Sequence, residues 1–249
     1  MYGIDVNFDF TTDTPNYWKS FWEQDSLLGC AGNDPDGKSK TLQKYHQLLW
    51  SRELPNGEKM KLEIGKGTSY LQWDDFCFGS DSIIASFRYK RYRGMIERVS
   101  KLLPNYRSFV EDYLHKSYTI GGVIIFPKRA GGINQSRGCN LYIKDRWDLT
   151  LECIRLFYMG KPSPLYDVLL AEKSFFDLFM DFKGYVDFFF LQDCVSSDYQ
   201  QVEFWMEYKG FVKNPLPQSP EEYLIWINKE LDFVCKRNKR IQSYIHSHF

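Results

Sequence analysis

The chain has 249 residues, of which 43% are hydrophobic and 26% are charged. These proportions are typical of a soluble globular protein, and the length fits one large domain, so we expect a single domain over residues 1–249. Lys plus Arg equals Asp plus Glu at 32 each, so the chain lacks the basic charge that gathers extended nucleic acid. Aromatic residues make up 18% and predict a large aromatic core, the alternative being a stacking surface for bases or sugars.

Cysteine spacing and hydropathy indicate the cellular compartment in which the protein acts. The six cysteines form no Cys-x-x-Cys pair, which argues against a zinc knuckle or a redox motif and favours reduced thiols in a cytoplasm. The first ten residues carry acids where a signal peptide needs basic residues. The apolar run at 175–191 includes Asp177, Asp181, Lys183 and Asp187, too many charges for a bilayer span. We therefore predict a cytoplasmic protein with no membrane partner.

The first half of the chain mixes short strands and helices. Residues 4–10 alternate between apolar and polar side chains, which predicts a half-buried opening strand, and residues 11–37 have the composition of a long surface connection. Ser39 precedes apolar residues at helical spacing, so we expect an N-capped helix that ends before the turn at 55–57. Further strands are expected at 60–64, 69–77 and 83–88, and helices at 92–103 and 106–115.

The second half is predominantly helical. Residues 120–126 are uncharged and rich in β-branched side chains, which predicts a central strand that stops at Pro127. Residues 145–193 follow a helical pattern with a break at 160–164, and residues 220–246 predict one long closing helix. We expect an α+β fold in which a small, mainly N-terminal β-sheet packs against a predominantly helical C-terminal half.

Residues 133–155 are the most informative stretch, because amides, acids and arginines gather there against a predicted core helix, and one face of the helix predicted at 145–158 is charged. At about 100° per residue, Asp148, Glu152 and Arg155 fall on the side opposite an apolar stripe. Asp148 and Glu152 are spaced i,i+4, which is unfavourable unless a cation lies between them. Arg155 is the obvious local partner, and Arg137 and Arg146 are further candidates. We predict Asp148 and Glu152 as catalytic acid, base or orienting groups, and the three arginines as contacts for an anionic ligand.

The segment before this helix adds amide groups and glycines. We expect a loop at 131–138 to carry Asn134, Gln135 and Arg137 to the charged face of the helix, where they contact the ligand. The alternative interpretation is structural: the same side chains fasten the loop to the helix and satisfy buried polar groups.

Several weaker patterns stay open. Asp177 and Asp181 lie opposite an apolar face in residues 175–190, and they either join the charged face described above or are simply solvated. Residues 65–69 and 79–82 resemble fragments of phosphate-binding turns, yet match no complete motif, so we expect tight turns. His46 is either a catalytic base or, as we expect, a structural residue. The basic cluster at 88–93 either touches a phosphate or begins a solvated helix. No metal-binding motif is found.

Five blocks of the sequence carry a family resemblance: residues 45–57, 79–83, 133–138, 145–155 and 175–189. They resemble an uncharacterised bacterial protein family, a domain of unknown function, and the resemblance covers most of the chain. It implies a bacterial or phage-associated cytoplasmic protein. The family has no assigned catalytic residues, so it implies no chemistry and no cofactor.

Two hypotheses of function follow. The first is a ligand-binding protein or enzyme that acts on a phosphate-bearing small molecule such as a nucleotide. The second is a protein-interaction partner, or the toxin or effector component of a bacterial defence module. A large exposed aromatic patch would favour the second, and a concave polar pocket would favour the first.

Overall fold

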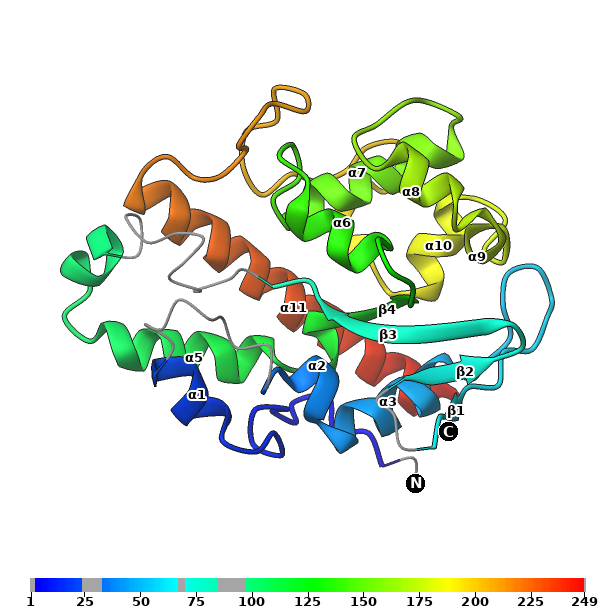
Figure 1. Cartoon of the computed structure of the whole chain (residues 1–249), viewed down its shortest axis with the longest axis horizontal. Helices are drawn as coiled ribbons and strands as arrows, with labels where there is room; N and C mark the ends of the chain where they lie inside the picture. The colour runs from blue at the N-terminus through cyan, green and yellow to red at the C-terminus, as the bar shows by residue number, and fades with distance from the viewer. Residues whose placement is uncertain (1–2, 24–32, 67–69, 85–96, 249) are drawn as a thin grey trace.

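The computed structural model describes residues 3–23, 33–66, 70–84 and 97–248. A four-stranded antiparallel sheet, in the order β1-β2-β3-β4, lies between two groups of helices (Figure 1). Helices within residues 133–188 lie over one side of β3 and β4, and helices from the N-terminal half lie on the other side. The long last helix, residues 220–248, packs against the helix at 106–117. The predicted α+β fold, with a small N-terminal sheet and a helical C-terminal half, is confirmed.

The elements have the following bounds. The strands are β1 Glu63–Ile64, β2 Leu71–Trp73, β3 Phe76–Ser82 and β4 Val123–Pro127. The helices before β4 are α1 Tyr17–Glu23, α2 Pro35–Lys38, α3 Lys40–Trp50, α5 Tyr106–Ser117 and the 3-10 helix η1 Ile120–Gly122. The helices after β4 are α6 Ile133–Cys139, α7 Trp147–Tyr158, α8 Tyr166–Leu170, α9 Lys173–Asp177, α10 Phe182–Phe188, η2 Gln192–Cys194 and α11 Pro220–His248.

Helices with local start and stop patterns form where the sequence predicts them. The hydroxyl of Ser39 accepts a hydrogen bond from the backbone N–H of Leu42 and caps α3. Helices α5, α7 and α11 match the predictions at 106–115, 145–158 and 220–246 to within a few residues. Residues 175–191 divide into α9 and α10, and both bury their phenylalanines.

The strand predicted at 4–10 is wrong, although its alternating burial is right. Ile4, Val6 and Phe10 are buried, but the backbone forms turns. The carboxylate of Asp5 accepts from the N–H of residue 7, and Asp9 accepts from the N–H of residue 11. These local hydrogen bonds offer the backbone an alternative to a sheet ladder.

The sheet itself differs from prediction at two places. The described part of the segment 69–77 is a hairpin, because Asp74 adopts a left-handed φ of 50° and turns the chain between β2 and β3. Residues 79–82, predicted as a tight turn, lie inside β3, where Gly79 pairs with Phe126 and Asp81 pairs with Ile124. The strand expected at 60–64 shortens to β1.

Strand β4 is completely buried, yet it lies at one end of the sheet and not at its centre as predicted. Among the described elements, helices and not a further strand cover the outer side of β4. The 3-10 helix before it packs closely on α11: the N–H of Gly121 donates to Asn238 Oδ1 at 2.7 Å. The guanidinium of the fully buried Arg237 donates to the carbonyl oxygens of Gly121 and Val123. This close approach explains the glycine at 121, while the glycine at 122 lies against the carbonyl oxygen of Ser117.

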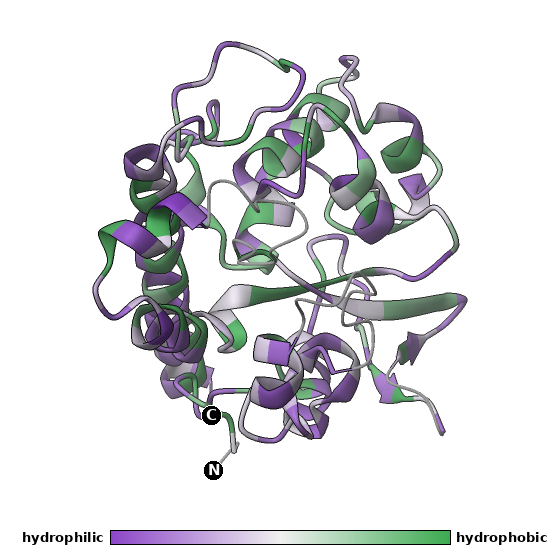
Figure 2. Cartoon of the chain, turned by 60° about the vertical axis from the view of Figure 1, so that its left-hand side comes forward, coloured by the Kyte–Doolittle hydropathy of each residue, from purple (hydrophilic) through white to green (hydrophobic). Residues whose placement is uncertain are grey.

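Aromatic rings fill the space between the layers, as the composition predicts. In Figure 2 apolar residues, drawn in green, run along the strands between the two groups of helices. Phe175, Phe176, Phe179, Tyr185 and Phe189 pack ring against ring at centroid distances of 5.0 to 5.8 Å. These rings are core residues, which accounts for much of the aromatic content.

Some predictions fall outside the described residues. These are most of the strand at 83–88, the first part of the helix at 92–103 and the basic cluster of Arg88, Lys90, Arg91 and Arg93. Residues 97–102 of the predicted helix are described and are helical.

Candidate functional site

The charged face of α7 is buried. Asp148 is 0% exposed and Glu152 is 5% exposed. The chain segment at 203–216 covers this side of the helix, and the backbone N–H of Trp205 donates to Asp148 Oδ2 at 3.1 Å. The face is therefore neither flat nor solvated, because other parts of the protein contact its two acids.

Each acid of this face has an arginine partner. Arg146 contacts Asp148 through two nitrogen atoms, at 3.0 and 2.5 Å, and also donates to the carbonyl oxygen of Pro215 at 2.8 Å. Arg155 contacts Glu152 through two nitrogen atoms, both at 2.8 Å. The predicted pairing of Glu152 with Arg155 is confirmed. The pair of Arg146 and Asp148 holds the segment at 203–216 on α7 through Pro215 and Trp205. This is a structural role, but its partners are not the loop residues named by the structural interpretation.

Arg137 does not reach that face, so the prediction that it is carried to Asp148 and Glu152 is wrong. The predicted loop is the short helix α6, which directs Arg137 toward β3. Its fully buried guanidinium contacts the carboxylate of Asp81, lies 3.6 Å from Asp145 Oδ1 and donates to Thr150 Oγ1 at 3.1 Å. Helix geometry turns the side chain to the sheet, where two acids compensate its charge.

The other predicted contacts lie near the same helix. Asn134 is half-buried and its amide donates to the carbonyl oxygen of Ser80 at 3.3 Å. Gln135 is exposed and accepts from the N–H of Gly131 at 3.1 Å. The structure thus brings Asn134 and Arg137 together around the end of β3 and leaves Gln135 at the surface.

The acids of residues 175–190 do not join the α7 face. Asp177 is exposed and pairs with Lys173. Asp181 accepts from the N–H of Gly184 at 2.7 Å and caps α10. Solvation and helix capping account for both side chains.

A directed chain of hydrogen bonds leads to Asp36 in α2. The Trp50 indole can only donate, so His46 Nδ1 accepts from it at 2.9 Å and the ring proton lies on Nε2. Nε2 then donates to Ser80 Oγ at 3.0 Å, and Ser80 donates to Asp36 Oδ1 at 2.8 Å. This order excludes His46 as the base for Ser80 and makes Asp36 the acceptor at the end of the chain.

The electrostatics of the group fit this order. Burial and the charge of Arg237 lower the pKa of His46 to about 3, which keeps the ring neutral. Burial, together with the charges of Asp34 and Asp81, raises the pKa of Asp36 well above its ordinary value. Burial also raises the pKa of Asp81 to about 7, against the opposing effect of Arg137. We call Asp36, Ser80 and Asp81, with Asn134 beside them, the β3 polar site.

Both carboxyl groups have raised pKa values, so each can hold a proton at a pH where an ordinary aspartate is ionised. A protonated carboxyl group can donate a proton and an ionised one can accept it, which are the two roles of general acid–base catalysis. Clusters of this kind are more frequent at functional sites than elsewhere, although structural networks also contain them. The site is partly open, since Asp81 is 19% exposed and Asp36, Ser80 and Asn134 are half-buried.

The raised pKa values predict how stability depends on pH. The folded protein holds protons on Asp36 and Asp81 that the unfolded chain releases near pH 4, so their contribution to stability is lost as pH rises from about 4 toward 7 and beyond. Asp36→Asn keeps an oxygen for Ser80 and removes one charge. Urea unfolding at successive pH values is expected to show that the variant gains stability relative to wild type as pH rises. A difference that is constant with pH contradicts this account.

Of the residues of the β3 polar site, Asn134 was predicted as a ligand contact, but Asp36, Ser80 and Asp81 were missed by sequence reasoning. Asp36 lies in a stretch with the composition of a surface connection, and Ser80 and Asp81 were assigned to a tight turn. The sequence offered one signal that residues 79–82 continue a strand, namely that Phe76, Phe78 and Ser80 recur at every second position. This signal is weak, because the same residues also follow directly on the hairpin turn before β3. The buried, fully partnered ring of His46 agrees with the structural role expected for it.

Two searches of the described residues bear on other classes of function. In the ranges that the structure describes, no three His, Cys, Asp or Glu side chains are grouped so that they could hold a metal ion. Within the same ranges, no helix combines the length and the apolar character needed to cross a membrane.

Comparison with known proteins places the chain in a family without identifying its activity. No curated protein and no solved structure matches it. One family model matches residues 4–241, which is most of the chain. The resemblance in the five sequence blocks is thereby confirmed: the chain belongs to DUF6994, a family of unknown function.

Proposed function

We propose that this protein is an enzyme, or a ligand-binding protein, that acts on a phosphate-bearing small molecule such as a nucleotide, and that its reactive group is the β3 polar site. The observation that carries the proposal is the pair of carboxyl groups, Asp36 and Asp81, on either side of Ser80 at the end of a directed hydrogen-bond chain. This replaces Asp148 and Glu152 as the proposed acid and base, because those two carboxylates are only 0% and 5% exposed, whereas Asp36 and Asp81 are partly open to a ligand.

The chemistry of the site suits hydrogen-bond donors on the ligand. Carboxylates accept from ribose hydroxyls and from amino groups of bases, whereas they repel a phosphate. In the proposed complex Asp36 and Asp81 therefore face the hydroxyl or amino groups of the ligand, and its phosphate lies away from them. Asn134 is the proposed amide contact. Arg137 is a positioning residue, since it is fully buried and acts through Asp81.

The proposal includes a bacterial cytoplasm as the place of action. Its support is the family resemblance together with the thiols of Cys77, Cys139, Cys153, Cys194 and Cys235, which are all free. Free thiols are usual in reducing compartments.

The competing hypothesis of a protein-interaction or effector component lacks the aromatic surface that would favour it. Among the described residues, Tyr142 is the aromatic side chain that counts as largely exposed. The remaining large exposed apolar residues are aliphatic and spread over several elements. We therefore give the small-molecule proposal precedence.

A ligand screen tests the proposed function. Thermal shift and calorimetry are run with nucleosides, nucleotides and dinucleotides, each with and without Mg²⁺. At least one phosphate-bearing compound is expected to stabilise the wild type, by about 2.7 kcal/mol at a hundredfold excess over Kd. Asp36→Asn is expected to weaken that ligand roughly tenfold, as the loss of a charged hydrogen-bond acceptor does.

The matched control is Asp112→Asn. Asp112 is exposed, pairs with Lys116 and lies far from β3 in the sequence. It should bind the ligand as the wild type does. The proposal fails if no compound of the screen stabilises the wild type, or if Asp36→Asn binds the ligand as tightly as Asp112→Asn.

A further inference from the structure

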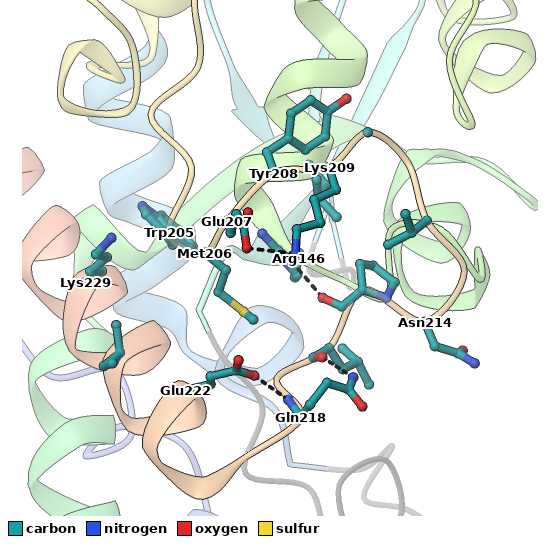
Figure 3. Close-up of a pocket in the computed structure, with 16 residues that line it drawn as sticks. Arg146, Trp205, Met206, Glu207, Tyr208, Lys209, Asn214, Gln218, Glu222 and Lys229 are labelled. Carbon is teal, nitrogen blue, oxygen red and sulfur yellow. Dashed lines mark hydrogen bonds and ion pairs between the residues drawn. The ribbon is translucent and has the colours of Figure 1, made fainter.

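A pocket of about 390 Å³ lies outside the β3 polar site, between the first turns of α11, the segment 205–218 and the start of α7 (Figure 3). Its volume is at the lower end of the range of about 300–1,000 Å³ that is usual for ligand pockets. A molecule smaller than a typical drug would fill it.

The base of the pocket is fixed before any ligand binds. Arg146 and Leu149 from α7 line it, as does the buried Trp205. Arg146 is held by the carboxylate of Asp148 and by the carbonyl oxygen of Pro215, and the Trp205 N–H is held by Asp148. A preformed wall lowers the ordering cost of binding.

One face of α11 supplies the wall opposite this base. Glu222, Ile225 and Lys229 all line the pocket, and their spacing of three and four residues places them on one side of the helix. Ile225 lies between the two charges and is 54% exposed. The charged residues are two turns apart, which corresponds to about 10 Å along the helix axis.

Among the described residues, these two side chains have no partner of opposite charge. Neither Glu222 nor Lys229 forms an ion pair with any described residue, although one carboxylate oxygen of Glu222 accepts from the backbone N–H of Gln218 at 2.7 Å. The other charged lining residues are already paired: Lys209 with Glu207 at 2.9 Å, and Arg146 with Asp148. The pocket thus offers one free charge of each sign with apolar surface between them.

We propose that this pocket binds a short peptide of two or three residues with apolar side chains. The free amino group of the peptide lies at Glu222 and its carboxylate lies at Lys229. An extended residue spans about 3.3–3.6 Å, so two or three residues cover the gap between charges two helical turns apart. The peptide side chains contact Ile225, Met206 and Leu216, which line the same pocket. This site is independent of the function proposed for Asp36 and Asp81.

The test uses Leu-Leu dipeptide and its two capped forms, N-acetylated and C-amidated, with binding followed by calorimetry and by backbone amide NMR shifts. Leu-Leu is expected to bind and to shift residues of 205–229. Each cap removes one charge and is expected to weaken binding roughly three- to fivefold, the effect of a partly exposed ion pair.

Two variants assign the ends of the ligand. In Glu222→Gln the N-acetyl cap is expected to cost nothing further, and in Lys229→Gln the amide cap is expected to cost nothing further. Lys236→Gln is the matched control, because Lys236 lies on the same helix and is exposed and paired with Asp232. It should retain the wild-type preference for the uncapped peptide.

The proposal is overturned if Leu-Leu shows no saturable binding, or if the three peptides bind the wild type equally. It is also overturned if hexanoate binds as tightly as Leu-Leu, which would indicate a site for simple anions. Unchanged cap effects in both Gln variants would place the peptide elsewhere and reject the assignment of its ends.

Discussion

Arg137→Ala is expected to lower the free energy of unfolding by about 3–5 kcal/mol, the effect of removing one partner from a buried ion pair. Arg137 is 0% exposed and compensates both Asp81 and Asp145. Its guanidinium also lies 5.4 Å from the ring of Trp147. The variant removes the cation that faces Asp81 and leaves a cavity beside an indole. Urea unfolding followed by circular dichroism measures the loss.

Two further substitutions make this result interpretable. Arg107→Ala removes an arginine that is 69% exposed and paired with Glu111, so it is expected to cost no more than about 1 kcal/mol. Arg137→Lys keeps the charge but loses the planar fork of donors, and is expected to fall between the two. Equal stability of Arg137→Ala and Arg107→Ala would mean that the pair with Asp81 does not support the fold.

Gly121→Ala is expected to cost about 3 kcal/mol or more, because a methyl group does not fit between η1 and α11. A Cβ at this position would lie 2.5 Å from the carbonyl oxygen of Val234 and 2.6 Å from Asn238 Oδ1. Relief requires α11 to move, and that movement strains two hydrogen bonds: the one that the Gly121 N–H donates to Asn238, and the one that Arg237 donates to the Gly121 carbonyl oxygen. Thermal unfolding followed by calorimetry is the appropriate measurement.

Gly37→Ala is the control for this prediction. Gly37 lies in α2, has open space around its Cα and needs no left-handed backbone. Alanine there is expected to be neutral or stabilising by up to about 1 kcal/mol. If the two alanine variants unfold at the same temperature, the close approach of η1 to α11 does not limit stability.

An element of this fold was predictable from the sequence when the residues that stabilise it lie close together in the chain. Ser39 caps α3 through a residue three positions away, and the apolar spacing of α11 spans its whole length, so both helices were predictable. The opening segment shows the limit. Its alternating burial was predictable, but the turn chemistry of Asp5 and Asp9 decided the backbone.

The same distinction between near and distant partners holds for the candidate site residues. Arg146 with Asp148 and Arg155 with Glu152 are two and three residues apart, so the sequence presented them as neighbours. The β3 polar site depends on pairs far apart in the chain. Ser80 meets Asp36 over 44 residues, and Arg137 meets Asp81 over 56 residues. No local pattern relates such residues.

The sequence by itself therefore determined the α+β class, the main helices, the aromatic core and the pairing of charges along α7. Only the tertiary structure decided that this charged face is covered by residues 203–216, that Arg137 turns to β3, and that Asp36 comes within range of the charge of Asp81. The physical reason is that a helix fixes neighbours within about four residues through its 1.5 Å rise. Contacts between α2, β3 and α6 exist only after the layers have packed, and burial then raises the pKa values of Asp36 and Asp81.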